Sequence, residues 1–180
     1  MVQIDDAGSG SLIGGTCIGL YWPNRDIFVY DFVPLECYTQ ENFKQKEYQK
    51  YVVRIIDNFF RELDISKTEE IQVCQGYVFD LLREYLTVNG YRWKSVKIEG
   101  VLQERVEKAF ADYTVSLGLP QSYISYTKYP FHFHKILRWV YADYDNRKQF
   151  CKSGWKSWQK YGNLPVKTSC GKMHSSGYIC

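Results

Sequence analysis

The spacing of apolar residues changes near residue 41, and this change restricts the chain to folds that combine a sheet with helices. Before it, apolar and β-branched residues bounded by turns predict three strands, at 2–6, 14–22 and 27–33. The turns at 7–11 and 23–26 are short and rich in Gly, Ser, Pro and Asn, and short turns join antiparallel neighbours. The first part of the chain therefore predicts a three-stranded antiparallel meander.

After residue 41 the apolar residues recur at three- and four-residue steps, which is the period of an amphipathic helix. Two units follow in which a short strand leads into a helix. Because strands joined through a helix lie parallel in right-handed crossovers, the chain predicts a mixed α/β sheet with the order β-β-β-α-β-α-β-α. The predicted helices span 41–63, 77–86 and 100–118, and the two further strands span 70–74 and 95–99.

The turn after the first predicted strand carries a short motif, Asp6-Ala7-Gly8-Ser9. It is similar to the Asp-x-Gly-Ser turn of Holliday-junction resolvases and actin-like ATPases, and the element order resembles the ribonuclease H-like superfamily to which both belong. The resemblance covers about residues 1–118. It implies a ribonuclease H-like α/β domain at 1–119, with a mixed five-stranded sheet and helices on both faces, followed by a basic aromatic C-terminal extension at 120–180.

Nucleases of this superfamily hydrolyse phosphodiesters with Mg²⁺ or Mn²⁺, which are hard cations held by clustered carboxylates. The resemblance implies acids at the end of the first strand, at the end of the fourth strand and in the last helix. Asp6 matches the first position, but the fourth strand ends at Cys74 without an acid. Glu99, at the end of the fifth predicted strand, and Glu104, in the last helix, complete the predicted catalytic and metal-binding set. Glu107 lies farther from the strand ends.

Each acid also has a structural interpretation. Asp6 can hold the Gly8 turn by hydrogen bonding, Glu99 can favour the start of a helix through the helix dipole, and Glu104 can face solvent. The glycine-rich turn is also compatible with phosphate binding in a small metabolic enzyme. The chain is too short for the second domain with which actin-like ATPases enclose a nucleotide.

The charge of the chain is divided unevenly. Residues 1–120 hold 13 Lys and Arg against 18 Asp and Glu, whereas residues 121–180 hold 10 against 2. The second segment also carries 13 of the 31 aromatic residues, and basic residues mixed with aromatics can bind phosphates and stack on bases. The sequence therefore predicts DNA or RNA as a partner, unless the aromatics form a small core of their own. The predicted nucleic-acid-binding residues are Lys152, Trp155, Lys156 and Trp158.

The cysteines and histidines give little support for zinc. Without a signal peptide, the six cysteines are expected to be reduced. His132 and His134 would share a face on a strand, and Cys170, His174 and Cys180 follow them, but there is no closely spaced Cys pair. No run of 18 apolar residues occurs, so we expect no membrane span and a cytoplasmic location.

Together these features predict a metal-dependent nuclease or nucleic-acid-processing protein. The alternative is a non-catalytic protein of the same fold, in which the missing fourth-strand acid marks lost activity. Such a protein would bind nucleic acid or mediate assembly, including a homo-oligomer of at least twice the chain mass of 21.3 kDa.

Overall fold

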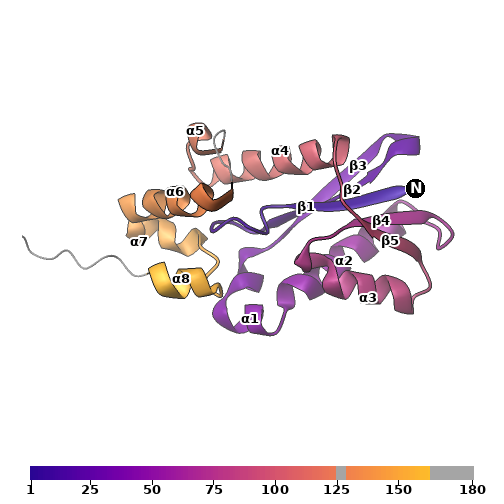
Figure 1. The fold of residues 1–180 in the computed structure, drawn as a ribbon, viewed down its shortest axis with the longest axis horizontal. Coiled ribbons are helices and arrows are strands. Elements are labelled where there is room, and N and C mark those ends of the chain that lie inside the picture. The colour runs from indigo at the N-terminus through magenta and orange to yellow at the C-terminus, as the bar shows by residue number, and fades with distance from the viewer. Residues whose placement is uncertain (125–128, 163–180) are drawn as a thin grey trace, which may run out of the picture.

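A five-stranded mixed sheet organises the molecule, as the sequence predicts for an α/β protein (Figure 1). The structure, a computed structural model, describes residues 1–124 and 129–162. The strand order is β3-β2-β1-β4-β5. β2 pairs antiparallel with both β1 and β3, whereas β4 pairs parallel with both β1 and β5. The strands are β1 (Val2–Ala7), β2 (Thr16–Trp22), β3 (Ile27–Val33), β4 (Glu70–Cys74) and β5 (Arg92–Val96).

Helices cover both faces of the sheet, and a group of C-terminal helices lies beyond one end of it (Figure 1). Helices α2 and α3 lie on one face and α4 lies on the other. The α-helices are α1 (Gln40–Lys44), α2 (Glu47–Glu62), α3 (Asp80–Val88), α4 (Val101–Ser116), α5 (Gln121–Ile124), α6 (Tyr129–Ala142), α7 (Tyr144–Arg147) and α8 (Lys156–Tyr161). Short 3₁₀ turns occupy Pro23–Arg25, Leu35–Tyr38, Tyr77–Phe79 and Lys148–Phe150.

The alternation of side chains along β1 divides the core between the two faces. Val2 and Ile4 pack with the helices α2 and α3, whereas Ala7 packs with α4. Gly19 in β2 allows α4 to lie close to the sheet, because a Cβ there would be only 2.2 Å from Cγ1 of Val106. This close packing fixes the position of α4, which contributes to the site described below.

Two predicted elements differ from the structure. The predicted helix at 41–63 is interrupted, because Lys46 adopts a left-handed conformation with φ of 56° between α1 and α2. The predicted strand at 95–99 begins earlier: β5 pairs with β4 from Glu70↔Arg92 to Cys74↔Val96 and ends three residues before Glu99.

The predicted arrangement of His132 and His134 is also different. Both lie on α6 and not on a strand, so a separation of two residues places them about 200° apart around the helix. They therefore do not share a face as ligands of one metal. The other predicted zinc ligands, Cys170, His174 and Cys180, lie outside the described residues.

The C-terminal extension shares a core with the loop that follows β1. Leu12 and Ile13 from this loop are buried with residues of α6 and with Cys151. Backbone hydrogen bonds join the two segments: the N–H of Gly14 donates to the carbonyl of Phe150 at 2.8 Å, and the N–H of Lys152 donates to that of Leu12 at 2.9 Å. The predicted boundary at 119/120 thus runs through a packed cluster.

Among the described residues, none of the helices is both long enough and apolar enough to cross a membrane.

Candidate functional site

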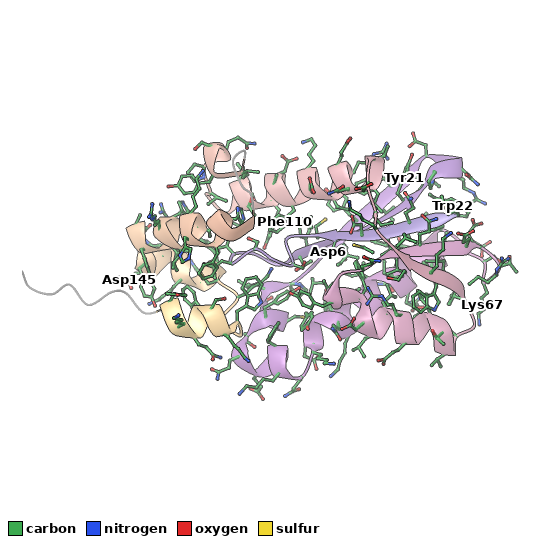
Figure 2. The ribbon with its side chains drawn as sticks, viewed as in Figure 1. Asp6, Tyr21, Trp22, Lys67, Phe110 and Asp145 are labelled. Atoms are coloured by element: carbon green, nitrogen blue, oxygen red, sulfur yellow. The ribbon has the colours of Figure 1, made fainter. Side chains whose placement is uncertain are left out.

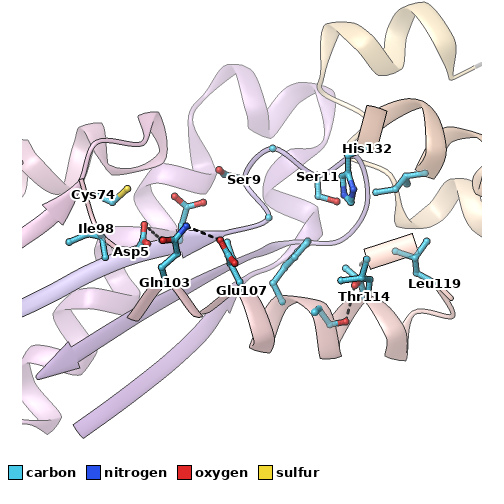
Figure 3. Close-up of a pocket in the computed structure, with 18 residues that line it drawn as sticks. Asp5, Ser9, Ser11, Cys74, Ile98, Gln103, Glu107, Thr114, Leu119 and His132 are labelled. Atoms are coloured by element: carbon cyan, nitrogen blue, oxygen red, sulfur yellow. Dashed lines mark hydrogen bonds between the residues drawn. The ribbon is translucent and has the colours of Figure 1, made fainter. Parts of the chain in front are cut away.

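A pocket of about 460 Å³ opens between the end of β1, the loop after it and the helices α4 and α6 (Figure 3). It lies at the end of β1 that faces the C-terminal helices (Figure 2). This is the carboxyl end of the parallel strands, where α/β proteins bind ligands. One end of the pocket holds acidic residues and the other end is largely apolar. Its lining comprises Asp5, Asp6, Ala7, Gly8, Ser9, Gly10, Ser11, Cys74, Ile98, Gln103, Glu107, Phe110, Ala111, Thr114, Leu119, Ile124, His132 and Ile136.

Both carboxylates of β1 reach the acidic end. One ligand atom each from Asp5, Asp6 and Cys74 lies within 4.8 Å of the others. A regular strand would direct Asp5 and Asp6 to opposite faces, which predicts that only one of them enters the site. Both acids stay paired with β2, but the pairing of β1 with β4 stops at Ile4↔Val73, and at this end of the sheet both acids line the pocket.

Helix α4 contributes Gln103 and Glu107, which are one turn apart on the same face. The Nε2 of Gln103 donates a hydrogen bond of 3.0 Å to Oε1 of Glu107 and so orients this carboxylate (Figure 3). The predicted Glu104 is exposed and does not line the pocket. It is adjacent to Gln103 in sequence, which places it about 100° around the helix.

The predicted Glu99 also lies outside the pocket. Its side chain is 66% exposed and forms an ion pair with Lys97. Because β5 ends at Val96, Glu99 is not at a strand end, and the chain has already turned toward α4. Of the three predicted carboxylates, only Asp6 lines the pocket, together with Asp5 and Glu107.

Burial changes the proton affinity of the acidic end. It raises the pKa of Asp5 to about 6, and the charges of Asp6 and Glu107 add to this, while hydrogen bonds from the Cys74 thiol and from the N–H of Asp6 oppose it. Burial and the neighbouring Asp5 raise the pKa of Cys74 to about 11. The thiol is therefore protonated at neutral pH and donates to Asp5, which leaves the carboxylates as the available ligands for a cation.

The raised pKa of Asp5 predicts a pH-dependent stability. Between about pH 4 and 6 the folded state holds the Asp5 proton that the unfolded state releases, so the free energy of unfolding falls as the pH rises through this window. A shift from 3.8 to about 6 corresponds to about 2–3 kcal/mol. In metal-free buffer, Asp5→Asn should gain this amount relative to the unsubstituted protein between pH 4 and 7, as measured by urea unfolding. The exposed Asp31→Asn should show no such gain, and equal pH dependence of all three proteins would contradict the assignment.

Asp6 lies at the end of β1, next to the tight loop that closes the pocket. Burial raises its pKa, whereas hydrogen bonds from Ser9 and the charge of Lys152 lower it. Gly8 has φ of 85°, and a Cβ there would meet the ring of Phe110 at 2.1 Å. Glycine is thus required both by the backbone and by the close approach of α4. Tyr77 further holds the loop by donating its hydroxyl to the carbonyl of Ser9 at 3.1 Å.

Lys152, predicted to bind nucleic acid, has its side chain inside the protein. It is fully buried, and its ammonium donates a hydrogen bond of 2.5 Å to the carbonyl of Gly8. The ammonium also lies over the rings of Tyr38, at 4.7 Å, and Trp155, at 5.1 Å. Burial lowers its pKa to about 7, against the charge of Asp6. The prediction that Lys152 contacts phosphates at the surface is therefore corrected: it supports the loop from the side opposite the solvent.

The other three predicted nucleic-acid-binding residues lie on or beside α8. Lys156 is exposed, as a phosphate-binding residue requires. Trp155 is half-buried against Lys152, and Trp158 stacks on Tyr144 with ring centroids 6.5 Å apart. The two tryptophans therefore pack against other residues of the protein. This packing leaves less of their rings free to stack on bases.

The end of the pocket away from the acids contains three polar side chains, Ser11, Thr114 and His132 (Figure 3). The Thr114 hydroxyl donates a hydrogen bond of 2.9 Å to the carbonyl of Ala111. Neither the hydroxyl of Ser11 nor Nδ1 of His132 has a hydrogen-bond partner, and both atoms are buried. Burial and the charge of Lys135 lower the pKa of His132. Around them the wall is formed by Leu119, Ile124 and Ile136.

The carboxylates of Asp5 and Asp6 lie close to each other and to the Cys74 thiol, and Glu107 lines the same pocket from the exposed side of α4. Carboxylate oxygens are the ligands that Mg²⁺ and Mn²⁺ prefer over sulfur. A cation would also stabilise the buried charge of Asp5, which the protein alone leaves unfavourable. The sequence signal for Glu107 was its spacing of four from Gln103 and three from Phe110, which places these residues on one face of α4.

Comparison with known proteins gives no relative: no family model, no curated protein and no solved structure matches the chain.

Proposed function

We propose that this protein is a metal-dependent phosphodiester hydrolase that cleaves nucleic acid and has a ribonuclease H-like fold. The observation that carries the proposal is the presence of Asp5, Asp6 and Glu107 in one pocket at the carboxyl end of the parallel strands. These acids come from β1 and α4, far apart in sequence. The mixed five-stranded sheet with helices on both faces agrees with the proposed fold.

Asp5, Asp6 and Glu107 would hold Mg²⁺ or Mn²⁺. Such a cation supplies an activated water and stabilises the charge that develops on the leaving oxygen. Gln103 positions Glu107, and the Cys74 thiol positions Asp5 by a hydrogen bond. The pocket thus presents oriented carboxylates without requiring an acid at the end of β4.

Nucleic acid is the substrate class that the charge distribution favours. The described part of the C-terminal extension forms one side of the pocket through Ile124, His132 and Ile136. The extension as a whole is the basic part of the chain. Exposed basic residues such as Lys156 and Lys160 lie on α8, in the same extension as Lys152, which hydrogen-bonds to the loop that closes the pocket. Phosphates would be attracted to this end of the molecule.

The test is incubation of the full chain with end-labelled DNA and RNA, single- and double-stranded. We expect cleavage with Mg²⁺ or Mn²⁺ and none when EDTA removes the metal. Salt-sensitive retention of nucleic acid with no cleavage under any metal would reject the hydrolase and support the non-catalytic alternative. Absence of both, with a mass of at least 42 kDa, about twice that of one chain, in light scattering, would instead support an assembly protein.

A further inference from the structure

We propose that the end of the pocket formed by Ser11, His132 and the surrounding apolar residues binds a nucleobase of the substrate. Several flat ligands with polar edges would suit such a site, and the choice of a nucleobase among them rests on the proposed function. The binding site itself follows from the lining of the pocket.

Two unpartnered polar atoms meet in this one cavity. In the described part of the chain, four buried side-chain N or O atoms lack a hydrogen-bond partner, and two of the four, Oγ of Ser11 and Nδ1 of His132, belong to residues that line the pocket. Ser11 is only 3% exposed. A buried polar atom without a partner costs about 1–3 kcal/mol, so folded proteins rarely keep two of them together. A ligand with polar edges would supply the missing partners.

The walls of this end suit a flat ring. Leu119, Ile124 and Ile136 provide apolar contacts, and Phe110 offers an aromatic side chain between this end and the acidic end. A nucleobase combines apolar faces with hydrogen-bonding edges, and proteins bind single-stranded bases by stacking and by contacts to these edges. A purely aliphatic ligand would leave Ser11 and His132 unpaired.

The distance between the two ends fits one nucleotide. Along α4, Glu107 lies at the acidic end and Thr114 at the other, and seven residues of helix span about 10 Å. This is of the order of the reach from the phosphate of a nucleotide to the edge of its base. A phosphodiester beside Asp5, Asp6 and Glu107 would therefore place a neighbouring base beside Ser11 and His132.

The chemistry of the two polar groups favours a neutral partner. Because burial and Lys135 lower the pKa of His132, its imidazole is neutral at pH 7 and offers either a donor or an acceptor at Nδ1. The Ser11 hydroxyl can also donate or accept. A phosphate would leave the apolar wall of Leu119, Ile124 and Ile136 without a matching surface, whereas a base matches both this wall and the polar pair.

The test measures binding of nucleosides, which lack phosphate, in buffer containing EDTA, so that it does not depend on the metal site. Adenosine, guanosine, cytidine and uridine are titrated into the full chain and followed by NMR, with ribose as the sugar-only probe. We expect at least one nucleoside to bind and ribose not to bind. Ser11→Ala and His132→Phe should each lower the affinity about tenfold or more, the effect of one lost hydrogen bond of about 1.4 kcal/mol.

The matched controls are Ser122→Ala and His134→Phe, which change exposed residues on α5 and α6. Ser11→Ala should fold, since it removes an unpaired buried hydroxyl, and thermal unfolding of each variant checks this. Failure of every nucleoside to bind, or equal affinity in both pocket variants and in the controls, would overturn the proposal. Nucleoside binding without metal-dependent cleavage would reject only the hydrolase, whereas cleavage without nucleoside binding would reject only the base site.

Discussion

Asp6→Asn and Glu107→Gln should each lower the rate of metal-dependent cleavage by about 100-fold or more. Residues that only hydrogen-bond to the ligands of a metal already contribute about 10–100-fold to affinity or activity, so loss of a direct carboxylate ligand should cost at least as much. Both substitutions preserve shape and remove one negative charge. The measurement is the initial rate of cleavage of the labelled strand at saturating Mn²⁺.

The controls for this experiment lie on the same elements or in the same sheet. Glu104→Gln changes the exposed acid three residues before Glu107 on α4, and Asp31→Asn changes an exposed acid of β3. Both should cleave at the unsubstituted rate. Equal losses in Glu104→Gln and Glu107→Gln would show that the charge of α4, and not the pocket, matters for the reaction, and would contradict the assigned site.

Lys152→Met should increase the free energy of unfolding by about 2 kcal/mol at pH 6. Methionine keeps the apolar stem and removes an ammonium whose burial lowers its pKa from 10.5 to about 7, a shift that corresponds to about 5 kcal/mol. Loss of the ammonium's contacts with the Tyr38 and Trp155 rings and of its attraction to Asp6 offsets part of this, which leaves a gain of about 2 kcal/mol. The carbonyl of Gly8 keeps a second donor, the N–H of Ser11 at 3.0 Å, which limits the cost of the change. An increase in the free energy of unfolding is expected when a protein keeps a functional group that lowers its stability.

The pH dependence provides the decisive measurement for Lys152. Between about pH 7 and 10 the unfolded chain binds the lysine proton and the folded chain does not, so the stability of the unsubstituted protein should rise toward that of Lys152→Met. Urea unfolding at pH 6, 8 and 9.5 follows this change. Lys156→Met on the exposed face of α8 is the control and should differ little from the unsubstituted protein at any pH. A Lys152→Met variant that is less stable than the unsubstituted protein at pH 6 would show that the buried ammonium stabilises the fold.

The sequence predicted most of the sheet, because its strands are runs of apolar and β-branched residues bounded by turn residues. The bounds of β3 and β4 match the predicted 27–33 and 70–74, since turn residues flank each run. The break at Lys46 could not be predicted, because a left-handed conformation is uncommon for lysine and the apolar spacing of helix residues continues across it. The strand β5 begins at Arg92, three residues before the predicted start. Buried and exposed residues do not alternate regularly along it, and its pairing with β4 sets its register.

The candidate site was only partly predictable, because it depends on contacts between distant segments. The turn motif identified Asp6, but Glu104 and Glu107 both lie near the apolar stripe of α4, and only the packing of Val106 over Gly19 decides which acid faces the pocket. Lys152 is a basic residue in a basic segment, so composition assigns it to the surface. Its burial follows from the hydrogen bonds that join the extension to the loop after β1.

The ammonium of Lys152 contacts the carbonyl of a residue 144 positions earlier in the chain. During synthesis, the loop containing Gly8 therefore leaves the ribosome long before the side chain that completes its support. A chain that ends before residue 152 contains every strand and every lining residue of the pocket, but it lacks the buried ammonium that hydrogen-bonds to Gly8. Only chains translated past Lys152 therefore acquire this support for the loop.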